Sequence, residues 1–382
     1  MNILYVCGQD PDRVEFGGQV RAHLIYEALR RIGTVRVLCS DPAVPEIPGE
    51  RRRLVSRPQG WLRRQINRVC WALYEWNAPS CPKVLPFPHD VDLESAFPGE
   101  RFDLIVVRCP HLAAITRICR YGRTFIDIDD DPGQVYDTFT APCQGRLRRW
   151  LLRRLIRNRL NRVLSRCAGG WVSNAGQVAW YPPRLNVRAL RNIPLPPSER
   201  YDPGVGRSRA LLTVGGMFWP PNYLGADAFL RDVWPRVRTA HPDLEYWIAG
   251  KNPPADYLSR WTATDGVKCL GFVDDLEDLY ARALAAVVPI DRGSGTCIKA
   301  REPLVLSRVC IATEFGARGF TANDRTGNGL LVYRDADEFL AHLERVLDEP
   351  WRAEAEKDAK RYADGNLSFD AFTKELEDCI RS

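Results

Sequence analysis

The sequence predicts an α/β protein built from two doubly wound domains with parallel sheets. First, short apolar runs alternate with segments of helical periodicity along most of the chain. Second, these runs are continuously apolar, which is typical of parallel strands that helices cover on both faces. Third, the alternation stops at the proline-rich segment RNIPLPPSERYDPGVGRSR and then restarts. With 382 residues, the chain is also too long for one ordinary core.

The first half opens with a strand, NILYVCG, and a helix over residues 19–33. The helix is predicted because apolar residues recur at helical spacing from Val20 to Leu29 and Gly33 ends the pattern. Later strands in this half are expected at residues 34–39, 102–108, 124–129 and 169–174. In the second half, strands are expected at residues 210–216, 244–250, 266–272, 285–290 and 309–314.

The composition excludes several classes of protein. Hydrophobic residues make up 45% and charged residues 27%, as in ordinary soluble globular proteins. No run of eighteen apolar residues predicts a membrane-spanning helix, and the N-terminus does not have the pattern of a secretion signal. The 12 cysteines are scattered without a C-x-x-C pair, which argues against a zinc site or a disulfide framework. We expect reduced, mostly buried cysteines and a cytoplasmic location.

The charge is unevenly distributed. Residues 1–200 carry 31 Lys and Arg against 19 Asp and Glu, whereas residues 201–382 carry 23 against 29. A basic half beside an acidic half suggests that the first half faces an anionic partner.

The segment DRGSGTCIKARE, Asp291 to Glu302, follows an apolar strand and is rich in small residues. A glycine-rich turn that opens a helix leaves backbone N–H groups free to bind an anion. Lys299 could neutralise a phosphate there, and Glu302 could accept hydrogen bonds from sugar hydroxyls. The alternative is a helix cap followed by a solvated Lys–Glu pair. The turn itself consists of Gly293, Ser294, Gly295 and Thr296.

The surrounding segments resemble, in order, those of family-four glycosyltransferases with the GT-B fold. FGGQVRAHLIYEAL is similar to the double-glycine turn before that family's first helix. VGGMFWPPNYLGADAFLRDVWPRVRTAHPDLEYWIAGKNP resembles the segment that opens its donor domain. GVKCLGFVDDLEDLYARALAAVVPIDRGSGTCIKARE and VCIATEFGARG resemble the strands, the phosphate-facing helix and the glycine turn that follow. The resemblance covers nearly the whole chain and is densest over Leu211–Gly319.

This resemblance implies a role for individual residues. Glu302 matches the glutamate that holds the donor ribose, and the turn from Gly293 to Thr296 matches the loop that cradles the diphosphate and the sugar. Lys299 matches a basic position of the G-S-G-T-x-x-K pattern, and His111 a histidine near the transferred sugar. The implied catalytic residues are His111, Lys299 and Glu302. The other implied donor-binding residues are Gly17, Gly18, Gly216, Asn222, Lys251, Phe272 and Val273, the last two through backbone against the nucleobase.

The sequence departs from the family pattern at two places. Ser294 stands where many relatives have a second glutamate, and GGMFWPPN lacks the Arg and Lys that contact phosphate in many relatives. Lys299 and backbone amides would then carry more of the phosphate charge. Asn222 could contribute, or it could serve as a helix N-cap.

The resemblance further implies retention of anomeric configuration, no metal ion and no side-chain nucleophile. The leaving diphosphate would help to deprotonate the acceptor, which requires preorganised positive potential around it. FIDIDDDPG contains Asp127, Asp129, Asp130 and Asp131, and its D-x-D spacing also fits a magnesium site. Two interpretations of these aspartates stay open: a metal site, or an acceptor-facing or capping role.

Two basic segments lie in the first half. Residues 146–166 contain nine arginines and no acid, with an apolar stripe from Leu147 to Val163. Either the stripe packs in the core below solvated arginines, or the arginines face an anionic surface. Arg51–Trp76 is also basic and contains Trp61, Trp71, Tyr74 and Trp76, which could lie at a lipid interface or stack on nucleic-acid bases.

We therefore predict a GT-B glycosyltransferase that moves a sugar from a nucleotide-sugar to a lipid-linked sugar or a growing surface polysaccharide. The alternatives are a soluble metabolite or a nucleic acid as acceptor, or an inactive homologue that acts as a binding subunit. We expect an acceptor-binding domain at residues 1–195, a linker at 196–208 and a donor-binding domain at 209–365. A C-terminal helix at 366–382 returns to the first domain in relatives. The expected location is cytoplasmic, peripheral on the inner face of the cytoplasmic membrane.

Overall fold

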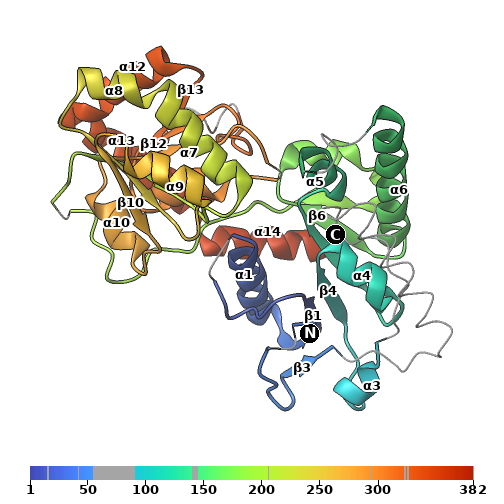
Figure 1. The fold of residues 1–382 in the computed structure, drawn as a ribbon. Helices are drawn as coiled ribbons and strands as arrows, with labels where there is room; N and C mark the ends of the chain where they lie inside the picture. Colours follow the sequence, from blue (N-terminus) through green and yellow to red (C-terminus); the bar gives the residue numbers. More distant parts are fainter. Residues whose placement is uncertain are drawn as a thin grey trace. The chain divides into compact units, whose positions relative to one another are not determined.

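The computed structural model describes residues 1–14, 17–41, 43–54, 91–139, 145–204, 206–293, 295–321, 324 and 327–381. The chain divides into two compact units (Figure 1). The first unit comprises Met1–Asn192 together with Phe372–Ser382, and the second comprises Ile193–Ala371.

The first unit contains a seven-stranded sheet in the order β3-β2-β1-β4-β5-β6-β7. All of its strand pairs are parallel, and β1 lies between β2 and β4, so the strand order reverses at the β1–β4 pair. The strands are β1 (Asn2–Cys7), β2 (Thr34–Cys39), β3 (Arg51–Arg53), β4 (Leu104–Arg108), β5 (Thr124–Asp129), β6 (Gly169–Val172) and β7 (Val187–Ala189).

Helices connect these strands. The α-helices of this unit are α1 (Gly17–Ile32), α3 (Leu93–Ala96), α4 (Pro110–Thr116), α5 (Pro132–Phe139) and α6 (Arg146–Leu164). The 3₁₀ helices are η1 (Ile118–Arg120), η3 (Ala175–Trp180) and η4 (Pro183–Leu185). The final helix, α14 (Phe369–Arg381), contributes most of its length to the first unit. Arg123 donates to the carbonyl oxygen of Ile380 at 2.6 Å, and Arg191 pairs with Glu375 at 3.0 Å.

The second unit contains a six-stranded parallel sheet in the order β10-β9-β8-β11-β12-β13. Its strands are β8 (Ala210–Val214), β9 (Glu245–Ala249), β10 (Val267–Gly271), β11 (Ala285–Val288), β12 (Cys310–Thr313) and β13 (Leu330–Tyr333). Its α-helices are α7 (Pro220–Asp232), α8 (Trp234–Ala240), α9 (Ala255–Thr262), α10 (Leu276–Arg282), α11 (Glu302–Val305), α12 (Ala336–Leu347) and α13 (Glu349–Asn366), and η5 (Ile298–Ala300) is a 3₁₀ helix.

The two sheets confirm the predicted fold class. The strands predicted in both halves are present. β1 is buried from Ile3 to Cys7 and β11 along its whole length, because helices cover both faces of a parallel sheet. The sequence analysis did not predict β3, β7 or β13, of three, three and four residues. The triple arginine of β3 lacks the apolar pattern of a strand, and β7 offers one buried residue.

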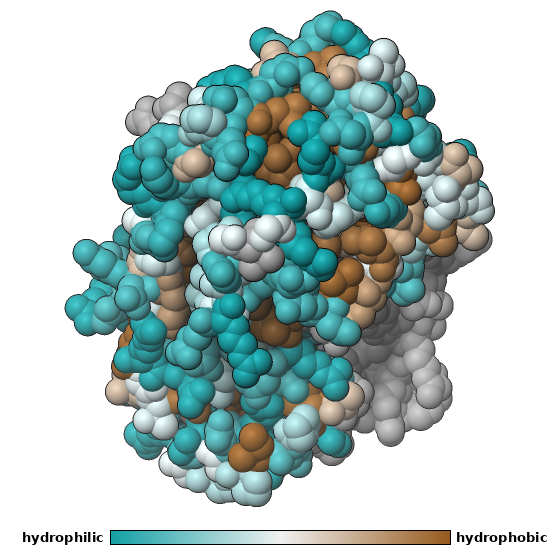
Figure 2. Space-filling model, turned by 90° about the vertical axis from the view of Figure 1, so that its left-hand side faces the viewer, coloured by the Kyte–Doolittle hydropathy of each residue, from teal (hydrophilic) through white to brown (hydrophobic). Residues whose placement is uncertain are grey.

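Each unit has its own hydrophobic core. In the second unit, aromatic rings from α7, α8, β9 and α12 pack together, with the ring centroids of Phe229 and Phe339 5.0 Å apart. Among the described residues, no helix is long and apolar enough to cross a membrane. The face of the molecule in Figure 2 is mostly hydrophilic, with scattered hydrophobic patches.

A close backbone approach fixes the carboxyl end of β9 in the second unit. Gly250 has φ +148°, and a Cβ added to it would lie 1.6 Å from the carbonyl oxygen of Gly215. The N–H of Gly215 donates to the carbonyl oxygen of Ala249 at 3.0 Å, and that of Gly250 to Gly271 at 2.7 Å. The ends of β8, β9 and β10 are thus held together at a point that only glycine can occupy.

We expect Gly250→Ala to lower the free energy of unfolding by about 3 kcal/mol, because it adds a clash to an unfavourable φ. Gly271→Ala is the matched control, since Gly271 also has positive φ (+66°) but its added Cβ would meet nothing within 4 Å. The control should lose about 1 kcal/mol. Urea denaturation of both variants measures the difference, and equal losses would contradict the role of the close approach.

Candidate functional site

The candidate site lies at the carboxyl edge of the second sheet, where the strand order reverses between β8 and β11. The two strands pair at Leu211–Ala285 and Leu212–Ala286. Beyond these pairs, the hydroxyl of Thr213 donates to the carbonyl oxygen of Val287 at 2.8 Å. Ligands of open α/β sheets bind at such a switch point, outside the carboxyl ends of the strands.

Residues from the loop after β8, from α7 and from η5 meet there. A Cβ added to Gly215 would lie 2.7 Å from Cε of Lys299 and 2.9 Å from Nδ2 of Asn222. Lys299 comes from the β11 side and lies against the loop that follows β8. The amide of Asn222 donates to the carbonyl oxygen of Gly216 at 2.8 Å and so fixes that loop. The structure therefore brings together three predicted residues, Lys299, Asn222 and Gly216, at the switch point.

Asn222 is not the N-cap of its helix. That position belongs to Trp219, and Asn222 is the third residue of α7. Of the two roles considered for Asn222, the capping role is wrong, because Pro220 and Pro221 begin the helix before it.

Lys251 and Phe272 form a second pair at the same edge. The ammonium of Lys251 lies 5.3 Å from the centroid of the Phe272 ring, and this ring is 62% exposed. The N–H of Met217 donates to the carbonyl oxygen of Lys251 at 3.0 Å, which joins the loop after β9 to the loop after β8. Val273, the next predicted residue, follows Phe272 in the loop after β10.

The glycine-rich turn is held by an arginine that the sequence analysis did not single out. Gly293 and Gly295 have φ +140° and +59°, conformations that favour glycine. Nε of Arg318 donates to the carbonyl oxygen of Gly295 at 2.9 Å, and its guanidinium carbon lies 4.3 Å from the centroid of the Phe315 ring. Thr296 packs against Gly319, where an added Cβ would lie 2.5 Å from the threonine methyl. Ser294 lies outside the described residues.

The prediction that the glycine-rich turn opens a regular helix is wrong. The chain makes a 3₁₀ turn at η5 and then the four-residue helix α11, with Glu302 as its first residue. Pro303 has no N–H to donate to the carbonyl oxygen of Lys299, and its ring would clash with that carbonyl, so a regular α-helix does not run through Lys299. A macrodipole from so short a helix is weak, and the positive charge at this edge comes mainly from side chains.

Glu302 is half-buried and fixed by a tyrosine of α10. The hydroxyl of Tyr280 donates to Oε2 of Glu302 at 2.8 Å. Burial raises the pKa of Glu302, while the hydrogen bond from Tyr280 and the charge of Lys299 oppose the shift. Burial also raises the pKa of Tyr280 well above its usual value, so Tyr280 is a neutral donor. Glu302 is therefore an oriented acceptor.

In the first unit, the predicted residues lie at the carboxyl edge of its own sheet. His111 is the second residue of α4, directly after β4, and Gly17 and Gly18 begin α1. Nη2 of Arg108, the last residue of β4, donates to the carbonyl oxygen of Gly18 at 3.3 Å. The two glycines are thus the first residues of α1 and not a turn before it, and Gly18 contacts the end of β4 beside the β1–β4 switch point.

Asp127 and Asp129 belong to a buried ion network with two arginines. Arg21 contacts Asp127 at 2.7 Å, and Arg108 contacts Asp127 at 2.9 Å and Asp129 at 2.8 Å. Burial opposes ionisation of Asp129, but the charges of Arg108 and Arg21 outweigh it and lower its pKa. Asn192 completes the network by accepting from Arg21 at 2.6 Å. These contacts favour a structural role for both carboxylates over the metal site.

Asp131 has the capping role considered for the aspartate run. Its Oδ1 accepts from the N–H groups of Gly133 and Gln134, at 2.9 and 3.1 Å, at the start of α5. Among the described residues, no group of three or more His, Cys, Asp or Glu could hold a metal ion.

The apolar stripe of the basic helix α6 is buried in one part and exposed in another. Ile156, Leu160 and Leu164 are buried. Near its beginning, Leu147 is 71% exposed and Trp150 is 54% exposed. The core-packing interpretation therefore holds for the second half of α6, and the anionic surface stays a prediction. In the other basic segment, Arg51–Trp76, residues 55–76 lie outside the described residues.

The roles of Arg318 and Tyr280, and the ion pairs of Arg21 and Arg108 with Asp127 and Asp129, were not predicted from the sequence. Arg318 lies in the quoted segment VCIATEFGARG, so its position after the glycine turn was the available signal. Tyr280 and Arg21 reach partners 22 and 106 residues away, and no local pattern indicates such contacts.

We expect Glu302→Gln to change the pH dependence of stability. Because the folded pKa is raised, the folded state keeps the proton more readily than the unfolded state, so wild-type stability falls as pH rises above about 4.5. The glutamine can still accept from Tyr280 but carries no charge to bury. The variant should therefore gain in relative stability from pH 4 to pH 8, measured by urea unfolding. The exposed Glu354→Gln is the control, and equal pH profiles of the two variants would contradict the account.

The comparisons with known proteins point to one class of enzyme. Residues 208–349, which contain the β8–β11 edge, match the family described as "Glycosyl transferases group 1". A search of curated proteins by sequence found no match.

Several solved structures share the fold. Sucrose-phosphate synthase from Thermosynechococcus elongatus has a TM-score of 0.67 and 14% identity, covering 100% of this chain and 98% of its own. Anabaena HepE in complex with UDP has a TM-score of 0.63 and 12% identity, covering 100% of both chains. WaaG, a glycosyltransferase involved in lipopolysaccharide biosynthesis, has a TM-score of 0.58 and 15% identity, covering 99% of both.

These neighbours confirm the predicted fold, two Rossmann-like units of the GT-B class. Residues 208–349 form a glycosyl transferases group 1 domain, and the chain is a glycosyltransferase.

Proposed function

We propose that the chain is a retaining, family-four glycosyltransferase that binds a nucleotide-sugar at the carboxyl edge of its second sheet. The observation that carries the proposal is the meeting of Gly215, Asn222 and Lys299 at the β8–β11 switch point. The backbone pairing of the two strands ends near there, and the Lys299 side chain lies against the loop after β8.

Lys299 is the proposed contact to the donor diphosphate. Its Cε lies beside the backbone of Gly215, where small residues let a phosphate approach. The glycine-rich turn from Gly293 would add backbone N–H donors, and Arg318 holds that turn in place through Gly295. Because Arg and Lys are absent from the loop after β8, Lys299 would supply much of the positive potential that the leaving diphosphate needs.

Glu302 and the β9–β10 edge are the proposed contacts to the nucleoside. Tyr280 holds one carboxylate oxygen of Glu302, and the carboxylate can accept from ribose hydroxyls. The backbone around Phe272 and Val273 would lie against the base, with Lys251 over the Phe272 ring. HepE was solved with UDP and with UDP and glucose, which supports a donor of this class.

The proposed reaction needs no side-chain nucleophile and no metal ion. The sugar–phosphate bond breaks as the acceptor hydroxyl attacks from the same face, and the departing diphosphate takes up the acceptor proton. Lys299 stabilises the charge that develops on the phosphate. His111, Gly17 and Gly18, at the carboxyl edge of the first sheet, are the proposed contributors of the first unit.

The proposed acceptor is a lipid-linked sugar or a growing surface polysaccharide at the inner face of the cytoplasmic membrane. Support comes from the basic first half and from α6, where arginines flank exposed apolar side chains such as Leu147 and Trp150. An amphipathic basic helix of this kind suits an anionic lipid surface. WaaG takes part in lipopolysaccharide biosynthesis, which is consistent with an acceptor of this kind.

We expect Lys299→Met to weaken binding of the correct nucleoside diphosphate by about 10- to 100-fold, because a charged hydrogen bond is worth roughly 1.5–3 kcal/mol. Isothermal titration with UDP, GDP, ADP and dTDP, without added metal, identifies the nucleotide and measures the loss. Lys268→Met removes the same charge from the exposed beginning of β10 and should leave the affinity unchanged.

Nucleotide binding that is equal in all three proteins would contradict the proposed site. Turnover separates the remaining alternatives: binding without sugar transfer to any acceptor would indicate the inactive homologue. The anomeric configuration of the product, measured by NMR, tests retention.

A further inference from the structure

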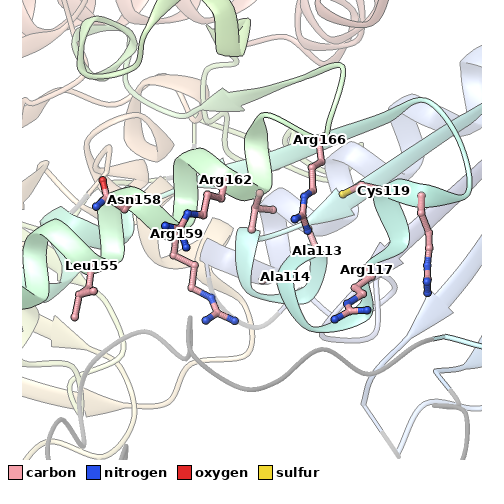
Figure 3. A pocket seen from close by; sticks show the side chains of 11 residues that line it. Ala113, Ala114, Arg117, Cys119, Leu155, Asn158, Arg159, Arg162 and Arg166 are labelled. Carbon is pink, nitrogen blue, oxygen red and sulfur yellow. The ribbon is translucent and has the colours of Figure 1, made fainter.

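A pocket of about 710 Å³ lies in the first unit between α4, η1 and α6. Figure 3 shows that α6 supplies Leu155, Asn158, Arg159 and Arg162 along one side, while Ala113, Ala114 and Arg117 come from the opposite element. The pocket is thus built from two segments about 40 residues apart in sequence. Its remaining lining residues are Cys119, Arg120, Val163 and Arg166.

Five of the eleven lining residues are arginines, and none of the eleven is acidic. Arg117 follows the end of α4, Arg120 ends η1, and Arg159 and Arg162 lie in the second half of α6, with Arg166 in the turn just after it. Burial and the neighbouring charge of Arg162 lower the pKa of Arg159, as expected where cations are held close together. An anion with several oxygen atoms would relieve this repulsion, because guanidinium groups bind phosphate oxygens in pairs.

The pocket is distinct from the carboxyl edge of the first sheet. α4 starts at the end of β4, and its last turn leads through η1 to the start of β5. Arg117 and Arg120 therefore lie toward the amino ends of the strands, past the end of α4 that is opposite His111. A ligand in this pocket would not occupy the position expected for the reacting groups.

Apolar surface adjoins the cations. Leu155 lines the pocket and is 53% exposed, and Ala113, Ala114 and Val163 complete its apolar part. Along the same helix, Leu147, Trp150 and Leu151 are also exposed. The lining contains no aromatic side chain on which a nucleic-acid base could stack. Cations beside exposed leucine and tryptophan instead match the boundary between lipid headgroups and acyl chains.

We propose that the α4–α6 pocket binds the phosphate group of an anionic phospholipid while the first half of α6 lies in the membrane interface. The proposal rests on the membrane contact proposed above and deepens it, from a diffuse basic face to a defined headgroup site. Arg159, Arg162 and Arg166 hold the phosphate oxygens, and Leu155 contacts the glycerol or acyl part. The site anchors the enzyme and is separate from donor binding.

The test compares two charge-matched double variants of the full chain in vesicle co-sedimentation. Arg162→Gln/Arg166→Gln removes two pocket arginines, and Arg146→Gln/Arg148→Gln removes two from the start of α6, outside the pocket. One set of vesicles is phosphatidylcholine with phosphatidic acid. The other is phosphatidylcholine with oleate, adjusted to the same surface charge. If the contact were diffuse, either double variant would bind roughly thirtyfold more weakly than wild type on either kind of vesicle.

On phosphatidic acid, the pocket variant should lose at least roughly tenfold more binding than the control variant. On oleate vesicles the two variants should behave alike. Arg162→Lys keeps the positive charge but lacks the planar guanidinium that binds two phosphate oxygens at once. This variant should bind more weakly than wild type only on vesicles with phosphatidic acid. Unchanged thermal unfolding midpoints and unchanged nucleotide affinity show that the variants are folded.

Three results would overturn the proposal. Equal losses in both double variants on both membranes would show a diffuse basic surface. Inorganic pyrophosphate that displaces the protein from vesicles at micromolar concentration would show a site for free phosphate. A wild-type chain that binds neither membrane would also contradict the proposed membrane contact. Nucleotide titration then tests donor binding separately, so the failure of one claim is distinguishable from the failure of the other.

Discussion

The reversal of strand order at the β8–β11 pair, whose register ends at Leu212–Ala286, positions the loops of the candidate site in the second unit. Two parallel strands whose connections leave in opposite directions cannot both continue to pair, and their loops move apart. The space is narrow because Gly215 lies against Lys299 and Asn222, and Gly250 lies against Gly215. The Lys299 side chain, backbone groups and the Asn222 amide therefore share one edge of the sheet, which suits the diphosphate of the proposed donor.

Much of this edge could be predicted from the sequence. Strand positions follow from apolar runs such as AAVVPI, and parallel strands bring the residues after each strand to one edge. Lys299, Asn222 and Gly216 could thus be expected to meet. The form of the segment after Lys299 was mispredicted, because the glycine turn suggested a regular helix while Pro303 imposes a break.

Contacts between distant segments could not be predicted in the same way. Arg21 contacts Asp127, which is 106 residues away in sequence. Together with Arg108, it forms an ion network with the aspartates of the D-x-D pattern. Spacing alone fits either a metal or an arginine as the partner of these carboxylates. The periodicity of α6 likewise predicts a stripe, but not that Leu160 is buried while Leu147 is exposed. Which part of a stripe is covered depends on the neighbouring elements.

The central claim is that a nucleotide-sugar binds where β8 and β11 separate. Hydrogen–deuterium exchange of the full chain, with and without each of UDP, GDP, ADP and dTDP, tests it most directly. The account predicts that one nucleotide slows amide exchange in residues 215–217 and 291–301 together, because the loops after β8 and β11 close on the same diphosphate. Protection confined to the first unit, or no protection in either loop with any of the four, would contradict it.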